Sequence, residues 1–88
     1  MTQDQPSAPP RSVVDARGLN CPLPVLRLRK RLKDLGAGAE VALLATDRAA
    51  LRDVPAFCEA QGHVLVEVED RGDGSHSFLV CKNPRANA

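Results

Sequence analysis

The sequence predicts an α/β (α+β) two-layer sandwich, in which a mixed four-stranded sheet carries two helices on one face. Strand and helix patterns follow one another in the order β-α-β-α-β-β, and only a glycine-containing turn separates the last two strands. This order is typical of strand-helix-strand units that end in a hairpin. At 88 residues, the chain is long enough for one small core. We expect that domain over residues 12–83, between a disordered tail at 1–11 and a short tail at 84–88.

The first half of the chain predicts a strand, a helix and a second strand. Residues 12–16 contain two adjacent valines and are followed by Gly18, which is typical of a short strand. The next segment has one apolar stripe at helical spacing, formed by Val25, Leu28, Leu32 and Leu35. Gly36 and Gly38 are expected to end this helix. Residues 40–46 are an apolar run, which fits a strand buried on both faces or placed in the middle of a sheet.

The second helix is predicted within residues 47–62, with an irregularity at Pro55. A helix that starts near Asp47 would be kinked at Pro55, whereas a helix capped by Asp53 would hold the proline in its first turn. We interpret both aspartates as helix caps, with hydrogen bonds around the loop after the first strand as the alternative. Gly62 is expected to end the helix. Its apolar residues at helical spacing are Leu51, Val54, Phe57 and Cys58.

The last two strands are predicted at 63–70 and 75–83, joined by a turn that contains two glycines. Residues 63–70 alternate in polarity, which predicts a strand with one buried face. The residues expected to point inward are Val64, Val66 and Val68. In the final strand, Phe78 and Val80 are expected to share a face.

Composition and charge exclude several classes of protein. No apolar run approaches the roughly 18 residues that a membrane span needs, and the polar, proline-rich start is no signal peptide. We therefore expect a cytoplasmic protein with no membrane contact. The net charge is only +1 and the chain has two phenylalanines but no Trp or Tyr, which disfavours direct nucleic-acid binding. Three cysteines without framework spacing are expected to be free thiols, and the protein is expected to be a monomer.

The stretch DARGLNCPLPV, residues 15–25, places a cysteine directly before two prolines where the first helix begins. The first N–H groups of a helix have no intrahelical partner, so Pro22 and Pro24 fit the first and third helical positions. A residue that precedes proline is pushed toward extended geometry. Cys21 is therefore predicted to be the N-cap, held outside the helix at its positive end.

A thiol in this position is expected to be reactive. The helix dipole and the unpaired N–H groups favour the thiolate, and Arg17 and Arg27 would add positive potential if their side chains reach back. The thiolate is the form that attacks and leaves in sulfur exchange. Thioredoxin-type dithiol chemistry is disfavoured because it needs a Cys-x-x-Cys pair, and Pro24 occupies the second position. The alternative is that Cys21 is an indifferent cap.

Two motifs resemble the TusA/SirA family of small bacterial sulfur carriers, and the resemblance covers residues 13 to about 82. The first is DARGLNCPLPVLRLRK at 15–30, and the second is TDRAALRDVPAFCEAQGH at 46–63. The resemblance implies a βαβαββ sandwich in which Cys21 carries a persulfide without a cofactor. It implies a cysteine desulfurase or a rhodanese-like protein as sulfur donor. It also implies a sulfur-accepting protein in tRNA thiolation, molybdenum-cofactor or sulfur-oxidation pathways.

One position departs from the family pattern. The family often has Asp-Pro at the start of the second helix, whereas here Asp47 is followed by Arg48. The start of the helix is then less rigidly set and gains a positive charge, which bears on the choice of partner.

The candidate site residues fall into three groups. Cys21 is the candidate catalytic residue. The residues expected to support its loop are Asp15, Gly18, Pro22, Pro24, Asp47 and Asp53. The residues expected to dock an acidic partner are Arg17, Arg27, Lys30 and Arg31, with a solvated helix face as the alternative. No metal site is expected, because no His and Cys spacing fits one.

The sequence thus predicts a sulfur-relay carrier and leaves open whether it counts as a sulfurtransferase enzyme. One alternative is a non-catalytic adaptor or regulator that docks through its basic first helix. The other is a thiol redox sensor that pairs Cys21 with Cys58 or Cys81. Cys58 lies on the apolar helix face and is expected to be a small buried residue. The role of Cys81 stays open.

Overall fold

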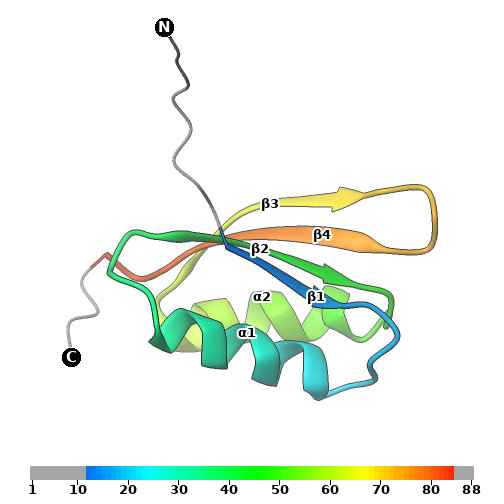
Figure 1. Ribbon diagram of the computed structural model, residues 1–88, viewed down its shortest axis with the longest axis horizontal. Coiled ribbons are helices and arrows are strands. Elements are labelled where there is room, and N and C mark those ends of the chain that lie inside the picture. Colours follow the sequence, from blue (N-terminus) through cyan, green and yellow to red (C-terminus); the bar gives the residue numbers. More distant parts are fainter. Residues whose placement is uncertain (1–11, 85–88) are drawn as a thin grey trace, which may run out of the picture.

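The computed structural model describes residues 12–84, and in it two helices cover one face of a four-stranded sheet (Figure 1). The elements are β1 (Ser12–Ala16), α1 (Leu23–Lys33), β2 (Glu40–Ala45), α2 (Ala50–Gln61), β3 (Val64–Asp70) and β4 (His76–Cys81). The predicted two-layer sandwich and its order of elements are confirmed. The predicted tails, apart from residue 84, lie outside the described residues.

The strand order β1-β2-β4-β3 defines two ends of the sheet. β1 and β2 are parallel, and β4 is antiparallel to both of its neighbours. The carboxyl ends of β1 and β2 therefore lie at the same end as the β3–β4 turn, which we call the Cys21 end. The carboxyl end of β4 and the amino end of β3 lie at the opposite end, where Cys81 pairs with both Glu40 and Val64.

The core lies between the helices and the inner face of the sheet. On α1, Leu28 and Leu32 are buried and Val25 packs against them, as the apolar stripe predicts. The residues that the strands bury are Val14, Ala16, Val41, Leu43, Ala45, Phe78 and Val80. Alternate residues of β2 stay partly exposed. β2 is thus central in the sheet but buried on one face only, which decides between the two alternatives for this apolar run.

α1 ends earlier than its glycines suggest. Its last residue is Lys33, and Asp34 is the C-cap in a right-handed conformation. The N–H groups of Asp34 and Leu35 donate to carbonyls three residues back, so the chain tightens into a turn before Gly36. Leu35 still packs against the core from this turn.

α2 begins at Ala50 and contains Pro55 in its interior, so Asp53 lies in the first turn rather than at the cap. The buried side chains of α2 follow a spacing of four residues: Ala50, Val54 and Cys58. The prediction that Leu51 belongs to this face is wrong. Leu51 follows the buried Ala50, so its side chain points to an adjacent side of the helix and is 39% exposed. Gly62 ends the helix with a φ of 78°, as expected, because this left-handed conformation favours glycine.

β3 is an edge strand, and the prediction that all three of its valines point inward is wrong. Val64 lies opposite Cys81 on the outer face, whereas Val68 lies opposite the buried Phe78 and shares its face. All three are exposed, by 48%, 50% and 42% for Val64, Val66 and Val68. The pairing of β3 with β4 shifts register between Leu65 and Glu67, which leaves Val66 as an extra residue. The alternation of faces changes phase at this bulge, and Leu65 is the residue that packs against the core.

Two leucines of α1 give a matched test of this packing. Leu28 is fully buried and Leu26 is 47% exposed. We expect Leu28→Ala to lower the free energy of unfolding by about 2–5 kcal/mol, because it removes buried methyl groups and leaves a cavity. Leu26→Ala is expected to cost less than about 1 kcal/mol. Urea unfolding followed by far-ultraviolet circular dichroism measures both, and equal losses would contradict the observed orientation of α1.

Candidate functional site

The loop between β1 and α1 presents Cys21 one residue before the cap of the helix. The Leu23 N–H donates to the Asn20 carbonyl at 2.8 Å, so Cys21 and Pro22 lie in the middle of a turn. The Pro22 carbonyl accepts the first helical bond, from Leu26 N–H, which makes Pro22 the N-cap. The predictions of Cys21 as N-cap and of Pro24 as third helical residue are therefore each wrong by one position. The Cys21–Pro22 peptide bond is cis.

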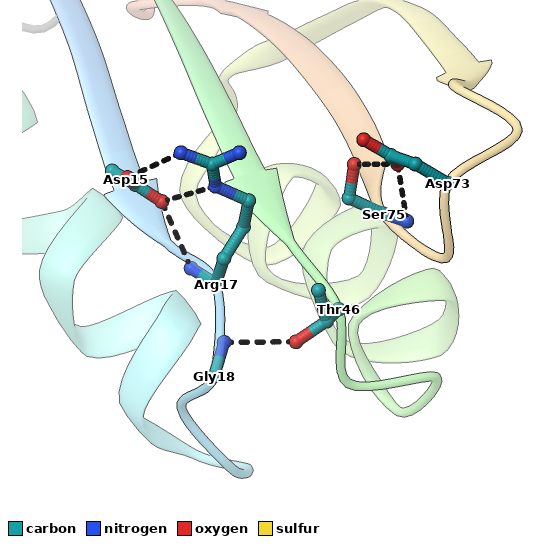
Figure 2. A network of polar contacts seen from close by, with 6 residues as sticks. All are labelled: Asp15, Arg17, Gly18, Thr46, Asp73 and Ser75. Carbon is teal, nitrogen blue, oxygen red and sulfur yellow. Dashed lines mark hydrogen bonds and ion pairs between the residues drawn. The ribbon is translucent and has the colours of Figure 1, made fainter.

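The start of this loop is held by two separate contacts at the carboxyl ends of β1 and β2 (Figure 2). Gly18, with a φ of 82°, donates its N–H to the Thr46 hydroxyl at 2.9 Å. Asp15 accepts from the backbone N–H of Arg17 and pairs with its guanidinium at 2.8 Å. These bonds hold the pKa of Asp15 well below its usual range. Asp15 and Arg17 thus engage each other rather than Cys21.

Two aspartates from the second half of the chain hold Cys21 itself. Asp47 accepts the Cys21 backbone N–H through Oδ2 at 2.5 Å and the Ala49 N–H through Oδ1 at 3.0 Å. It therefore caps the turn before α2 and braces the loop at once. Asp53 accepts the thiol of Cys21, with 2.9 Å between Sγ and Oδ2. Its other oxygen accepts from Arg52 at 3.1 Å.

The charges beside the sulfur favour the thiol over the thiolate. The pKa of Cys21 is raised, first by its hydrogen bond to Asp53, then by burial and by the charges of Asp53 and Asp47. Arg52 acts in the opposite direction. The pKa of Asp53 is lowered by the same thiol and by Arg52, so Asp53 stays ionised. The expectation of a thiolate favoured by Arg17 and Arg27 is not met.

Three of the four predicted docking residues lie together on the side of α1 that faces β1, rather than around Cys21. A groove of about 450 Å³ runs between β1 and α1, lined by Val14, Asp15, Arg27, Lys30, Arg31 and Asp34. Arg31 donates to the Ser12 hydroxyl and, at 3.5 Å, to the Val13 carbonyl. The structure therefore brings Arg27, Lys30 and Arg31 together, whereas Arg17 is committed to Asp15.

The other two cysteines are free thiols in distinct surroundings. Cys58 is buried, as expected, and burial raises its pKa to about 11. Cys81 donates to the Gly38 carbonyl at 3.4 Å, at the end of the sheet opposite to Cys21. Within residues 12–84, no group of three His, Cys, Asp or Glu side chains is placed to hold a metal ion. None of the described helices is both long and apolar enough to cross a membrane.

Sequence reasoning missed Thr46 and Arg52. Thr46 ends the apolar run of β2 and was indistinguishable from a strand residue, although its hydroxyl holds Gly18. Arg52 directly precedes Asp53, and that adjacency is the signal that could have shown a paired carboxylate.

Substitutions at Asp53 and Arg52 are expected to move the thiol pKa in opposite directions. Asp53→Asn keeps an oxygen that accepts the hydrogen bond but removes the charge, so the pKa of Cys21 falls. Each unit of decrease raises the thiolate fraction at neutral pH about tenfold. Arg52→Gln removes the opposing cation, so the pKa rises and alkylation slows. Iodoacetamide rates at Cys21 between pH 6 and 10, read by peptide mass, measure both. Identical profiles in all three proteins would contradict the role given to Asp53.

Three comparisons place the chain among known proteins. The protein family described as "Sulfurtransferase TusA" matches residues 12–82. The "Sulfur carrier protein TusA" of Pseudomonas paraeruginosa is 39% identical over 74 residues, which are 84% of this chain and 92% of that protein. The protein of the same name from Pseudomonas putida is 43% identical over 61 residues, which are 69% of this chain and 76% of that protein.

A solved structure agrees with these sequence matches. The SirA-like protein from Desulfitobacterium hafniense superposes with a TM-score of 0.72 at 28% identity, and the match covers 78% of this chain and 93% of that one. The family match spans β1 to the end of β4, including Cys21 and both aspartates that hold it. The chain is therefore a member of the TusA family.

Proposed function

We propose that this protein carries sulfur between two partner proteins as a persulfide on Cys21. The observation that carries the proposal is the exposed Cys21 thiol bonded to the Asp53 carboxylate at 2.9 Å, in a chain whose relatives are named sulfur carriers. An exposed sulfur at the tip of the domain can enter a partner's active site. The residues around it hold the thiol, so the partner supplies the rest of the chemistry.

The proposed step is an exchange of sulfur without net oxidation. The sulfur of Cys21 attacks the outer sulfur of a cysteine persulfide on the donor, which forms a new S–S bond on Cys21. The S–S bond of the donor breaks, and its cysteine leaves as a thiolate that takes up the proton lost by Cys21. The donor therefore starts as a persulfide and ends as a thiol, whereas Cys21 starts as a thiol and ends as a persulfide. The second transfer, to the acceptor, is the same exchange in the outward direction.

We propose that Asp53 keeps Cys21 as a protonated thiol until a partner protein binds. The raised pKa keeps Cys21 protonated, and Asp53 orients the S–H bond along its own carboxylate. A donor that brings a cation to Asp53 would lower the pKa of Cys21, and a donor that brings a base to the sulfur would remove its proton directly. Asp53 is thus proposed as a positioning residue rather than a catalytic one.

The groove between β1 and α1 is the proposed docking surface. Its cations Arg27, Lys30 and Arg31 would steer an acidic surface of the donor or the acceptor toward the domain. A cysteine desulfurase or a rhodanese-like protein is the proposed donor, and a sulfur-accepting protein completes the relay. We propose that the protein acts as a monomer in the cytoplasm, where its three free thiols would stay reduced.

The geometry does not favour a disulfide-based sensor. Cys81 pairs with Glu40, whereas Cys21 contacts Asp47, just beyond the other end of β2. Six strand residues separate the two thiols by more than the ~7 Å between Cα atoms that a disulfide allows. Cys58 is 2% exposed and lies in the core.

Mass spectrometry tests the carrier directly. After incubation with a cysteine desulfurase and cysteine, or with a rhodanese and thiosulfate, we expect the intact protein to gain one sulfur atom that reductant removes. Cys21→Ser should gain none, whereas Cys81→Ser should load normally. No adduct from either donor, with Cys21 still open to alkylation, would reject the carrier and favour the adaptor.

Charge reversal tests the docking surface separately from the chemistry. We expect Arg27→Glu with Lys30→Glu to raise the KM for transfer from the donor by about tenfold or more and to leave kcat nearly unchanged. The reason is that the two residues act on encounter, not on the sulfur. Arg29→Glu, on another side of α1, is the control. An unchanged KM in the double variant would place docking elsewhere.

A further inference from the structure

The carboxyl ends of α1 and α2 enclose a second pocket, of about 170 Å³. Lys82 follows β4 directly, and its backbone bonds to Ala39 beside the amino end of β2. The pocket is therefore at the end of the domain opposite to Cys21. Its lining comes from both helices, the residue before β3 and the residue after β4: Arg29, Leu32, Lys33, Phe57, Gln61, His63 and Lys82.

The lining combines positive charge with an apolar floor. Three of its residues are cationic, one is an amide and one an imidazole, and none is a carboxylate. Leu32, only 2% exposed, and the half-buried Phe57 form the apolar part. The groove between β1 and α1 differs, because Asp15 and Asp34 stand among its cations.

Two of the polar groups are held in place by the fold. Lys82 Nζ donates to the Leu35 carbonyl at 2.6 Å. His63 Nδ1 accepts the Asn83 backbone N–H at 2.9 Å, and its ring contacts Phe57 with 5.5 Å between centroids. Because Nδ1 is the acceptor, a neutral His63 carries its proton on Nε2 and can donate there. Burial and, after it, the charge of Lys82 lower the pKa of His63, which keeps the imidazole neutral.

The positive charge exceeds what the end of α1 requires. Carbonyl groups at the end of a helix attract cations, which accounts for Lys33 in the last turn of α1. Lys82 is engaged by the Leu35 carbonyl, in the turn after the helix. Arg29 lies a full turn before the last residue of α1. Neither Arg29 nor Lys33 has an ion pair within residues 12–84.

We propose that this pocket binds a small tetrahedral oxyanion of the phosphate or sulfate class. Arg29 and Lys33 supply the charge, and Lys82 and the Nε2–H of His63 supply fixed donors. Charge-assisted hydrogen bonds of this kind are the strong ones in proteins. The pocket is smaller than the roughly 300–1,000 Å³ of sites for drug-sized ligands, which favours a free ion over a nucleotide.

The test is an NMR titration of the isotope-labelled full chain with sodium sulfate and, separately, sodium phosphate, at constant ionic strength kept with sodium chloride. We expect saturable shifts confined to residues of the pocket. We also expect sulfate to raise the pKa of His63, because a bound anion beside Arg29, Lys33 and Lys82 favours the imidazolium. Sulfate is the probe for this pKa because its own charge stays constant between pH 5 and 8.

Matched variants decide the outcome. Arg29→Gln with Lys33→Gln should weaken binding at least about tenfold, since each removes a charge-assisted bond from an exposed position. Arg27→Gln with Lys30→Gln, on the same helix, should leave binding unchanged. Three outcomes would overturn the proposal: shifts that do not saturate, the same shifts with chloride alone, or shifts that persist in the Arg29/Lys33 variant. Each of them would indicate general charge screening rather than a bound oxyanion.

Discussion

The position of the reactive sulfur depends on two carboxylates that lie far from it in sequence. Asp47 holds the backbone N–H of Cys21 and Asp53 holds its thiol, across 26 and 32 residues of chain. β2 ends two residues before Asp47, so the parallel pairing of β1 with β2 brings Asp47 to the loop that follows β1. The core residues that pack α2 against the sheet then position Asp53 beside the Cys21 thiol. The geometry of Cys21 is thus a product of the whole fold rather than of its own helix.

The two aspartates act on the thiol in the direction opposite to that of the helix start. A helix start alone would favour the thiolate and leave the sulfur open to any oxidant or electrophile. The aspartates oppose that tendency and raise the pKa of Cys21. In the relay proposed above, a partner that changes the charge around Asp53 would release the reactivity of the sulfur, and the encounter itself would then set the specificity.

Local patterns were sufficient for the order of elements, because glycines or prolines mark most of the boundaries and the helices have a clear apolar period. Local patterns failed where a shift of one residue changes the position of a helix cap or the face on which a strand residue lies. The turn over Asn20 to Leu23 moves the helix cap from Cys21 to Pro22. The bulge at Val66 shifts the alternation of β3, so that Leu65 rather than Val64 lies on the core face. The contact of Asp53 with Cys21 is tertiary, so the sequence offered it only as an alternative to helix capping.

The bulge in β3 has a further consequence for the behaviour of the protein in concentrated solution. A sheet with two open edges can template the addition of strands from other copies. On β3 the bulge twists the backbone out of register, and Glu67, Glu69 and Asp70 line the strand with negative charge. On β1 the Arg31 guanidinium reaches the Val13 carbonyl and occupies part of the edge. The β3 edge is therefore a poor template for strand addition, although three valines are exposed along it.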